Sequence, residues 1–202
     1  MMINQNTVIG VIGLGYVGLP LAVEFGKKFK VVAFDKDQER MDQISKGIDR
    51  TGQLEKEEIE LSSNLVFTDD SKNLTDCSVY IVTVPTPVDQ DNKPDFSSLE
   101  KASEMIGKYL SKDDVVIYES TVYPGATREV CIPILESSSR LEFNKDFFCG
   151  YSPERINPGD KEHTVTKILK VTSGSTPKIA KEIDQLYKEI ITAGVSSIIN
   201  DS

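Results

Sequence analysis

The chain has 202 residues, of which 39% are hydrophobic and 27% are charged. This length predicts one folded domain, or one domain and part of a second, and the composition supports a buried core and excludes a wholly disordered chain. The 32 acidic and 23 basic residues give a net charge of −9, which disfavours binding to the phosphate backbone of a nucleic acid. No apolar run approaches the roughly 20 residues that span a bilayer, and the polar first residues carry no secretory signal. We therefore expect a soluble, cytoplasmic protein that binds neither nucleic acid nor membrane.

Short apolar runs rich in β-branched residues alternate with segments whose apolar residues recur at helical spacing. The runs predict strands at residues 8–12, 31–34, 65–68, 79–84, 115–118, 147–151, 168–172 and 195–199. The helical segments lie at residues 16–28, 37–46, 97–110, 125–136 and 177–191. Near-continuous apolar strands joined by helices indicate a mostly parallel sheet that is covered on both faces. The predicted fold is a doubly wound α/β domain that occupies residues 1–202.

The first predicted turn carries the pattern GLGYVG at residues 13–18, directly after a strand and at the start of a helix. Gly13 permits the tight turn, Gly15 lets the backbone approach a pyrophosphate, and Gly18 allows close packing of the helix on the strand. The N–H groups and dipole of the first helical turn also favour an anion. The pattern indicates a dinucleotide site, although a strand-to-helix turn of an unrelated α/β fold can use the same glycines.

Asp35 ends the second predicted strand, about 20 residues after the glycines, where a carboxylate accepts hydrogen bonds from ribose hydroxyls. Its charge would repel a 2′-phosphate, so NAD is favoured over NADP as the cofactor. The nearby cations Lys36 and Arg40 weaken this preference, because they would suit the phosphate. The alternative role of Asp35 is to cap the helix that follows it.

Three loops follow the carboxyl ends of later strands, where ligands bind in this fold. They cover residues 84–87, 119–125 and 151–160 and are rich in proline and small hydroxyl residues. Proline holds a loop rigid, which suits a preorganised site, but it also simply ends strands and starts helices. In the third loop, Glu154 could act as a general base and Arg155 could bind a phosphate. The two could equally form a solvated charge pair on the surface.

The histidine and the cysteines give no sign of a catalytic or metal site. His163 is the only histidine and lies in a polar segment, so a surface position is favoured over a catalytic one. Cys77, Cys131 and Cys149 are widely spaced, and none has a histidine or basic neighbour to lower the thiol pKa. They form neither a disulfide framework nor a CxxC metal pair. We expect buried free thiols and no bound metal.

Four sequence motifs, taken in order, resemble the UDP-glucose/GDP-mannose dehydrogenase family over residues 7–194. They are GLGYVGLPLA at residues 13–22, VPTP at 84–87, STVYPG at 120–125 and SPER at 152–155. The run PERINPGD at residues 153–160 is similar to the UDP-N-acetylhexosamine 6-dehydrogenase branch of that family, of the Vi-antigen and capsule type. Within this branch the resemblance favours UDP-N-acetylglucosamine as substrate, with the galacto and manno epimers as alternatives.

The resemblance implies an NAD-dependent oxidation that removes four electrons from the substrate. Two NAD molecules would take hydride in turn, and the C6 alcohol of the sugar would become a carboxylate through a thioester on a cysteine. The uronic acid would be used to make capsular or other surface polysaccharide.

The family's site residues can be carried over to this chain motif by motif. The cofactor would be bound by Gly13, Gly15, Tyr16, Val17, Gly18, Asp35, Arg40, Thr86 and Thr121. Thr121 and Glu154 would be catalytic. Thr121 would lie beside the nicotinamide and help to order a catalytic water, and Glu154 would act on that water or on the substrate hydroxyl. Arg155 and Ile156 would border the sugar nucleotide.

Family members continue into a central helix with a catalytic lysine and asparagine, and then into a second domain with the nucleophilic cysteine and most of the UDP site. No cysteine of this chain lies in the family's cysteine motif, and the tail after Gly194 does not resemble the run into that helix. We therefore expect an NAD-binding half that is inactive alone and whose parent is a homodimer. The alternatives are a non-catalytic nucleotide-binding module and a Rossmann dehydrogenase of a small hydroxy acid.

Overall fold

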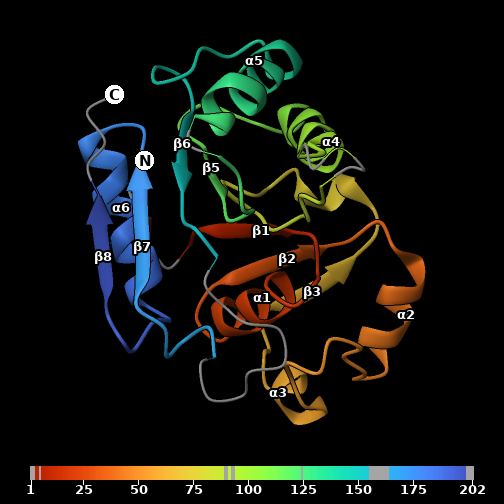
Figure 1. Ribbon diagram of the computed structural model, residues 1–202. Coiled ribbons are helices and arrows are strands. Elements are labelled where there is room, and N and C mark those ends of the chain that lie inside the picture. The colour runs from red at the N-terminus through yellow and green to blue at the C-terminus, as the bar shows by residue number, and fades with distance from the viewer. Residues whose placement is uncertain are drawn as a thin grey trace.

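The computed structural model describes residues 3–4, 6–88, 91, 94–123, 125–154 and 164–198. In this part of the chain, eight strands form one sheet in the order β3-β2-β1-β4-β5-β6-β7-β8 (Figure 1). The strands are β1 (Val8–Ile12), β2 (Lys30–Phe34), β3 (Leu65–Thr68), β4 (Val79–Val82), β5 (Val115–Tyr118), β6 (Phe148–Tyr151), β7 (Lys170–Gly174) and β8 (Val195–Ile198). The helices are α1 (Gly18–Gly26), α2 (Gln38–Ser45), α3 (Lys56–Glu60), α4 (Ser97–Gly107), α5 (Ile132–Ser139) and α6 (Pro177–Lys188). A 3₁₀ turn η1 (Ser71–Leu74) and a π-helical turn η2 (Thr127–Cys131) complete the described elements.

The register of the strands brings their carboxyl ends to one edge of the sheet. Ile12 of β1 lies beside Phe34 of β2 and Val82 of β4. Val82 in turn lies beside Tyr118 of β5, which lies beside Tyr151 of β6. The loops that follow these strands therefore meet at the same edge, which is where a doubly wound sheet binds its ligands.

Helices cover both faces of the sheet and bury two apolar cores. One core lies between the sheet and α1 with α6, and the other lies between the sheet and α4 with α5 (Figure 1). In β4, Val79 and Ile81 face the first core, whereas Tyr80 and Val82 face the second. Because both faces are covered, the strand is a continuous apolar run rather than an alternating one. The predicted doubly wound α/β fold is confirmed.

β7 departs from the parallel pattern, because it pairs antiparallel with β6, and β8 then pairs parallel with β7. The sequence predicted a mostly parallel sheet but did not specify which strand would reverse. Parallel strands need a crossover connection, usually a helix, whereas an antiparallel strand needs only a loop.

Three short features differ from the predicted elements. α3 and η1 were not predicted, because four or five residues are too few to show helical periodicity. The helix predicted at residues 125–136 is the π-helical turn η2 followed by α5. Pro133 lies in the first turn of α5 and has no N–H to donate, which interrupts a regular helix at this point. Among the described residues, no helix has the length and apolar character needed to cross a bilayer.

Candidate functional site

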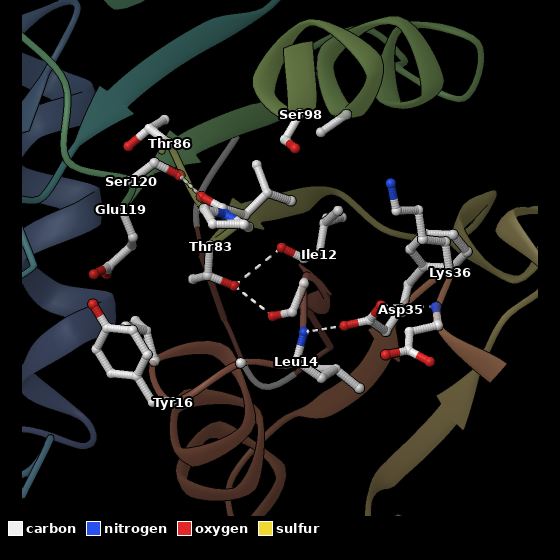
Figure 2. A pocket seen from close by; sticks show the side chains of 18 of the residues that line it. Ile12, Leu14, Tyr16, Asp35, Lys36, Thr83, Thr86, Ser98, Glu119 and Ser120 are labelled. Carbon is white, nitrogen blue, oxygen red and sulfur yellow. Dashed lines mark hydrogen bonds between the residues drawn. The ribbon is translucent and has the colours of Figure 1, made fainter. Parts of the chain in front are cut away.

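A cavity of about 770 Å³ opens at the edge where the strand carboxyl ends meet. Its walls come from the turn after β1, the end of β2, the loops after β4, β5 and β6, and helix α4 (Figure 2). The predicted site residues that line it are Gly13, Gly15, Tyr16, Val17, Asp35, Arg40, Thr86, Thr121 and Glu154. The predicted substrate residues Arg155 and Ile156 lie outside the described residues, as does His163, for which a surface position is predicted. The volume is in the range of small-molecule and cofactor sites.

The three glycines of the first turn serve different geometric purposes. Gly13 has a φ of 95°, a conformation that L side chains rarely adopt. A Cβ on Gly18 would lie 1.8 Å from the Gly13 carbonyl oxygen, so only glycine fits where α1 packs under the turn. A Cβ on Gly15 would meet no atom within 4 Å. Gly15 therefore has no packing requirement inside the protein, and its open side faces the cavity.

Thr83 fastens this turn to the neighbouring strand and was not singled out from the sequence. Its hydroxyl lies 2.6 Å from the Gly13 carbonyl oxygen and 3.0 Å from the Ile12 carbonyl oxygen (Figure 2). Its position in the sequence could have identified it, because Thr83 is the first residue after β4 and directly precedes the loop at residues 84–87 that was predicted to carry function.

Asp35 joins the turn to the end of β2. Its Oδ2 accepts a hydrogen bond from the backbone N–H of Leu14 at 2.7 Å, and its Oδ1 accepts one from the N–H of Asp37 at 3.0 Å (Figure 2). The cap of α2 is Asp37, which accepts from the N–H of Arg40 at 3.1 Å, so the alternative role of Asp35 as the helix cap is wrong. Each carboxylate oxygen has two lone pairs, and Asp35 therefore keeps acceptor capacity toward the cavity.

Arg40 supports the turn from below. Its side chain is only 1% exposed, and its Nε donates to the Leu14 carbonyl oxygen at 2.8 Å. A second guanidinium nitrogen forms an ion pair with the buried Asp49 at 2.7 Å. Burial raises the pKa of Asp49, but hydrogen bonds from Arg40, Thr51 and Leu54 outweigh burial and hold that pKa below its ordinary value. Arg40 thus acts on the cavity mainly by shaping the turn, and a direct contact with a ligand stays a prediction.

The loops after β4 and β5 are tied to one another at the far wall of the cavity. The Ser120 hydroxyl donates to the Val84 carbonyl oxygen at 2.6 Å. The Thr86 hydroxyl donates to the carbonyl oxygen of Thr121. These two bonds fix the relative position of the predicted residues Thr86 and Thr121 without using the Thr121 side chain, which is exposed.

Glu119 is a buried carboxylate in the same wall, and no role was predicted for it from the sequence. It accepts short hydrogen bonds from Lys170 Nζ and from the Tyr187 hydroxyl. Figure 2 shows it on the same side of the cavity as Tyr16. Burial raises the pKa of Glu119, and its partners Lys170 and Tyr187 lower it again without cancelling the rise. These partners are 51 and 68 residues away in sequence, so no local pattern could have predicted the cluster.

The three cysteines lie away from the cavity, in the core between the sheet and the α4–α5 layer. All three are buried free thiols. Burial raises the pKa of Cys77 to about 12 and also raises those of Cys131 and Cys149. A thiol is a nucleophile only as its thiolate, so these residues are chemically inert in the folded protein.

Comparison with known proteins gives consistent matches. A family model described as the NAD-binding domain of the UDP-glucose/GDP-mannose dehydrogenase family matches residues 7–191. A UDP-N-acetyl-D-glucosamine 6-dehydrogenase from Pseudomonas aeruginosa is 62% identical over 186 residues, and its counterpart from Salmonella typhi is 52% identical over 186 residues. Each of these alignments covers 92% of this chain and 44% of the relative. The solved structure of a UDP-D-ManNAc dehydrogenase from Pyrococcus horikoshii superposes with a TM-score of 0.87 at 28% identity, over 97% of this chain and 47% of that one. The chain thus spans a little less than half the length of these proteins.

Proposed function

Because the chain belongs to the UDP-glucose/GDP-mannose dehydrogenase family, in the region of its NAD-binding domain, we propose that the cavity binds NAD. We further propose that the whole protein is a nucleotide-sugar 6-dehydrogenase that oxidises the C6 alcohol of UDP-N-acetylglucosamine to the carboxylate. Two relatives that carry this activity in their names, at 62% and 52% identity, support the choice of substrate. The chain would supply the cofactor site, and the oxidation would also use the part of the protein that the relatives possess beyond the aligned region.

The turn at residues 13–18 fits the pyrophosphate of NAD. α1 begins at Gly18 without a side-chain cap, so no side chain competes with a ligand for the first N–H groups of the helix. The open side of Gly15 gives a phosphate room to approach the backbone. An anion at this place also gains from the helix dipole.

Asp35 fits the adenosine ribose, since it faces the cavity with unused lone pairs and is held in place by two backbone N–H groups. The two ribose hydroxyls can donate to these lone pairs. A 2′-phosphate would meet the same carboxylate and be repelled, which favours NAD over NADP.

The nicotinamide end would lie against the loops after β4, β5 and β6. When bound, NAD would supply the acceptor for the hydride that leaves C6 of the sugar nucleotide. Thr121 would orient a water or the sugar hydroxyl, and Glu154 would take the proton from that group. Glu154 and Thr121 line the same cavity, which supports this assignment. Arg155 and Ile156 would follow Glu154 at the border of the sugar nucleotide.

The single observation that carries this proposal is the open side of Gly15 facing a cavity whose other wall holds Asp35. Calorimetric titration of the 202-residue chain with NAD tests it, with the Gly15→Val variant as the comparison. Since a side chain at Gly15 meets no protein atom, we expect the variant to keep its thermal stability and to lose at least about tenfold in NAD affinity, about 1.4 kcal/mol. Unchanged affinity in a folded Gly15→Val variant would refute the site.

The substrate is tested separately by following NADH formation from UDP-N-acetylglucosamine. We expect NAD binding but no NADH from the 202-residue chain, with the Pseudomonas aeruginosa relative as the positive control. NADH formation with a small hydroxy acid instead would favour the alternative Rossmann dehydrogenase.

We also propose that the whole protein works in the cytoplasm as a homodimer and that its product is used for capsular or other surface polysaccharide. The order of motifs that resembles the family supports this assignment. Analytical ultracentrifugation of the whole protein tests the dimer.

A further inference from the structure

A layer of buried polar groups lies beneath the far wall of the cavity, on the face of the sheet that α6 covers. It consists of Glu119 after β5, Lys170 at the start of β7 and Tyr187 in α6. The side chains of Glu119 and Lys170 are 0% and 5% exposed, and Tyr187 is also fully buried. Lys170 and Tyr187 each contact a different oxygen of the Glu119 carboxylate. The Glu119 carboxylate therefore connects the end of β5, at the cavity, with both β7 and α6, which together are called the α6–β7 unit.

The polar layer continues into β6 and β7. Ser152 follows Tyr151, which pairs with Tyr118, and its N–H donates to the Tyr118 carbonyl oxygen at 3.0 Å. The next residue on β5 is Glu119, so Ser152 is its neighbour across the strands. Thr172 lies one residue beyond the Tyr151–Ser173 pair and faces the same layer. The hydroxyl oxygens of Ser152 and Thr172 are buried, and neither has a hydrogen-bond partner in the part of the chain that the structure describes.

A buried polar layer of this kind is not expected to stabilise the folded state more than apolar side chains would. Replacing a buried ion pair by apolar side chains of similar volume is often neutral or stabilising. Buried hydroxyls without partners add a further cost, because they lose their hydrogen bonds to water. Charges that persist in these surroundings, at the wall of a ligand cavity, point to a role in the site.

Glu119 is also the first residue of the loop that forms this wall. Ser120 and the carbonyl of Thr121 hold the loop to the strand β4 side, through Val84 and Thr86. Glu119 holds the same loop to the opposite side, through α6 and β7. The loop is thus fixed from both sides, and Thr121 has a defined position over the cavity.

The positive charge of Lys170 also affects the electrostatics of the cavity wall. Burial is the main cause that raises the pKa of Glu119, of Tyr187 and of Tyr16, and the charge of Glu154 adds a smaller rise to each. Glu119 and Glu154 therefore lie close enough for their charges to interact. Lys170 is the cation that pairs with Glu119 among the described residues. It therefore limits the repulsion between the two carboxylates at the wall of the cavity.

We propose that Glu119 is a positioning residue for the nicotinamide end of bound NAD, acting with Lys170 and Tyr187. The carboxylate fixes the loop that carries Thr121 against β7 and α6, and the ammonium of Lys170 compensates the charge of Glu119. The adenosine end of the cavity, at Asp35, is not connected to this layer by any described contact. This inference rests on the proposed function, because it assumes that the ligand of the cavity is NAD.

The test compares two ligands, because ADP-ribose has every part of NAD except the nicotinamide. The Glu119→Gln/Lys170→Met double variant removes both charges together, so that neither is left buried without its partner. We expect its NAD affinity to fall about tenfold and its ADP-ribose affinity to stay within about twofold. In saturation-transfer NMR, the signals of the nicotinamide protons should weaken relative to those of the adenine protons.

The control is the Glu142→Gln/Lys145→Met variant, which makes the same chemical change at an exposed ion pair outside the cavity. It should change neither affinity. The thermal unfolding of both variants is followed in parallel, and Tyr187→Phe serves as a milder variant that keeps both charges and should show a smaller effect of the same kind.

The outcomes separate the two proposals. Equal changes in NAD and ADP-ribose affinity, or no change in either, would overturn the positioning role of Glu119 while leaving the NAD site intact. Failure of the unsubstituted chain to bind both ligands would reject the NAD site itself, and the positioning role with it.

Discussion

Two arginine–aspartate pairs have the same 2.7 Å separation but differ strongly in how far their side chains are exposed to solvent. The Arg40–Asp49 pair is buried, with side chains 1% and 0% exposed, whereas the Arg50–Asp37 pair is 47% and 38% exposed. An exposed pair gains little, because water screens the charges and the long side chain loses freedom. In a buried pair, removal of one partner leaves a charge that nothing compensates.

We expect Arg40→Met to lower the free energy of unfolding by about 3–5 kcal/mol, because Asp49 would stay buried without its cation. Arg50→Met should lower it by less than about 1 kcal/mol. Denaturant titrations of the two variants check this, and Arg40→Met/Asp49→Asn should recover part of the loss. Small and equal losses in both single variants would contradict a supporting role of Arg40 beneath the turn.

Residues of the site differ in how well the sequence predicted them. The turn at residues 13–18 and Asp35 were identified because their spacing follows from local geometry, a strand, a tight turn and the end of the next strand. The direction of the Arg40 side chain was not, since it depends on Asp49, which belongs to a loop without a pattern. Glu119 was missed because its partners, Lys170 and Tyr187, meet it only after the sheet has formed.

At the scale of elements, β5 carries a buried carboxylate at each end. Glu119 follows it at the cavity edge and has a cation as partner, whereas Asp114 precedes it at the other edge. Asp114 accepts a hydrogen bond from the Ser111 N–H at 2.7 Å. Burial raises the pKa of Asp114 to about 7, with a smaller contribution from the charge of Asp113.

The raised pKa of Asp114 makes stability depend on pH. Between its ordinary pKa of about 3.9 and its folded pKa of about 7, the folded state holds a proton that the unfolded state has released. Stability therefore falls as the pH rises through this window, and the loss is complete above pH 7. Asp114→Asn cannot ionise and can still accept from Ser111, so it should escape this loss.

Thermal unfolding of the wild type and of Asp114→Asn between pH 4 and pH 8 checks this expectation. The two Tm values should be similar near pH 4, and the variant should have the higher Tm at pH 8. Each kcal/mol of difference in the free energy of unfolding should raise the Tm by about 2–4 °C. Taking the difference between the two proteins removes the contribution of other titrating groups. A constant difference across the range would show that Asp114 does not change its charge there.

Strand positions were predicted well, since β3 and β5 coincide with their apolar runs at residues 65–68 and 115–118. The reversed direction of β7 was not predicted, because an apolar run has no direction and the pairing partner is chosen by tertiary packing. The π-helical turn before α5 was also missed, although Pro133 in the predicted helix was a local signal of irregular structure.

At the scale of the whole molecule, all three thiols lie in one of the two cores. Cys77, Cys131 and Cys149 belong to the core on the α4–α5 side, and none belongs to the core on the α1–α6 side. Their reaction with a thiol reagent therefore reports on the opening of one layer of the protein.

We expect the folded chain to react very slowly with a disulfide reagent and to show three reactive thiols in denaturant. NAD at a hundred times its Kd should slow the reaction of the folded chain up to about 100-fold, because binding stabilises the folded state by about 2.7 kcal/mol. Mass spectrometry of the labelled chain identifies which thiol reacts first. Rapid labelling that NAD leaves unchanged would show that this core opens without disturbing the cavity.

The reversal at β7 also decides how the protein would respond to mechanical force. β7 runs away from the cavity edge, and β8 runs beside it in the same direction, so β8 ends at the edge where β1 begins (Figure 1). β8 is also the outermost strand of the sheet. A load applied before β1 and after β8 would act on the β7–β8 hydrogen bonds one after another instead of all together. The sheet would then peel from β8 inward, so the β7–β8 pairing would break before the strands that carry the cavity loops separate from one another.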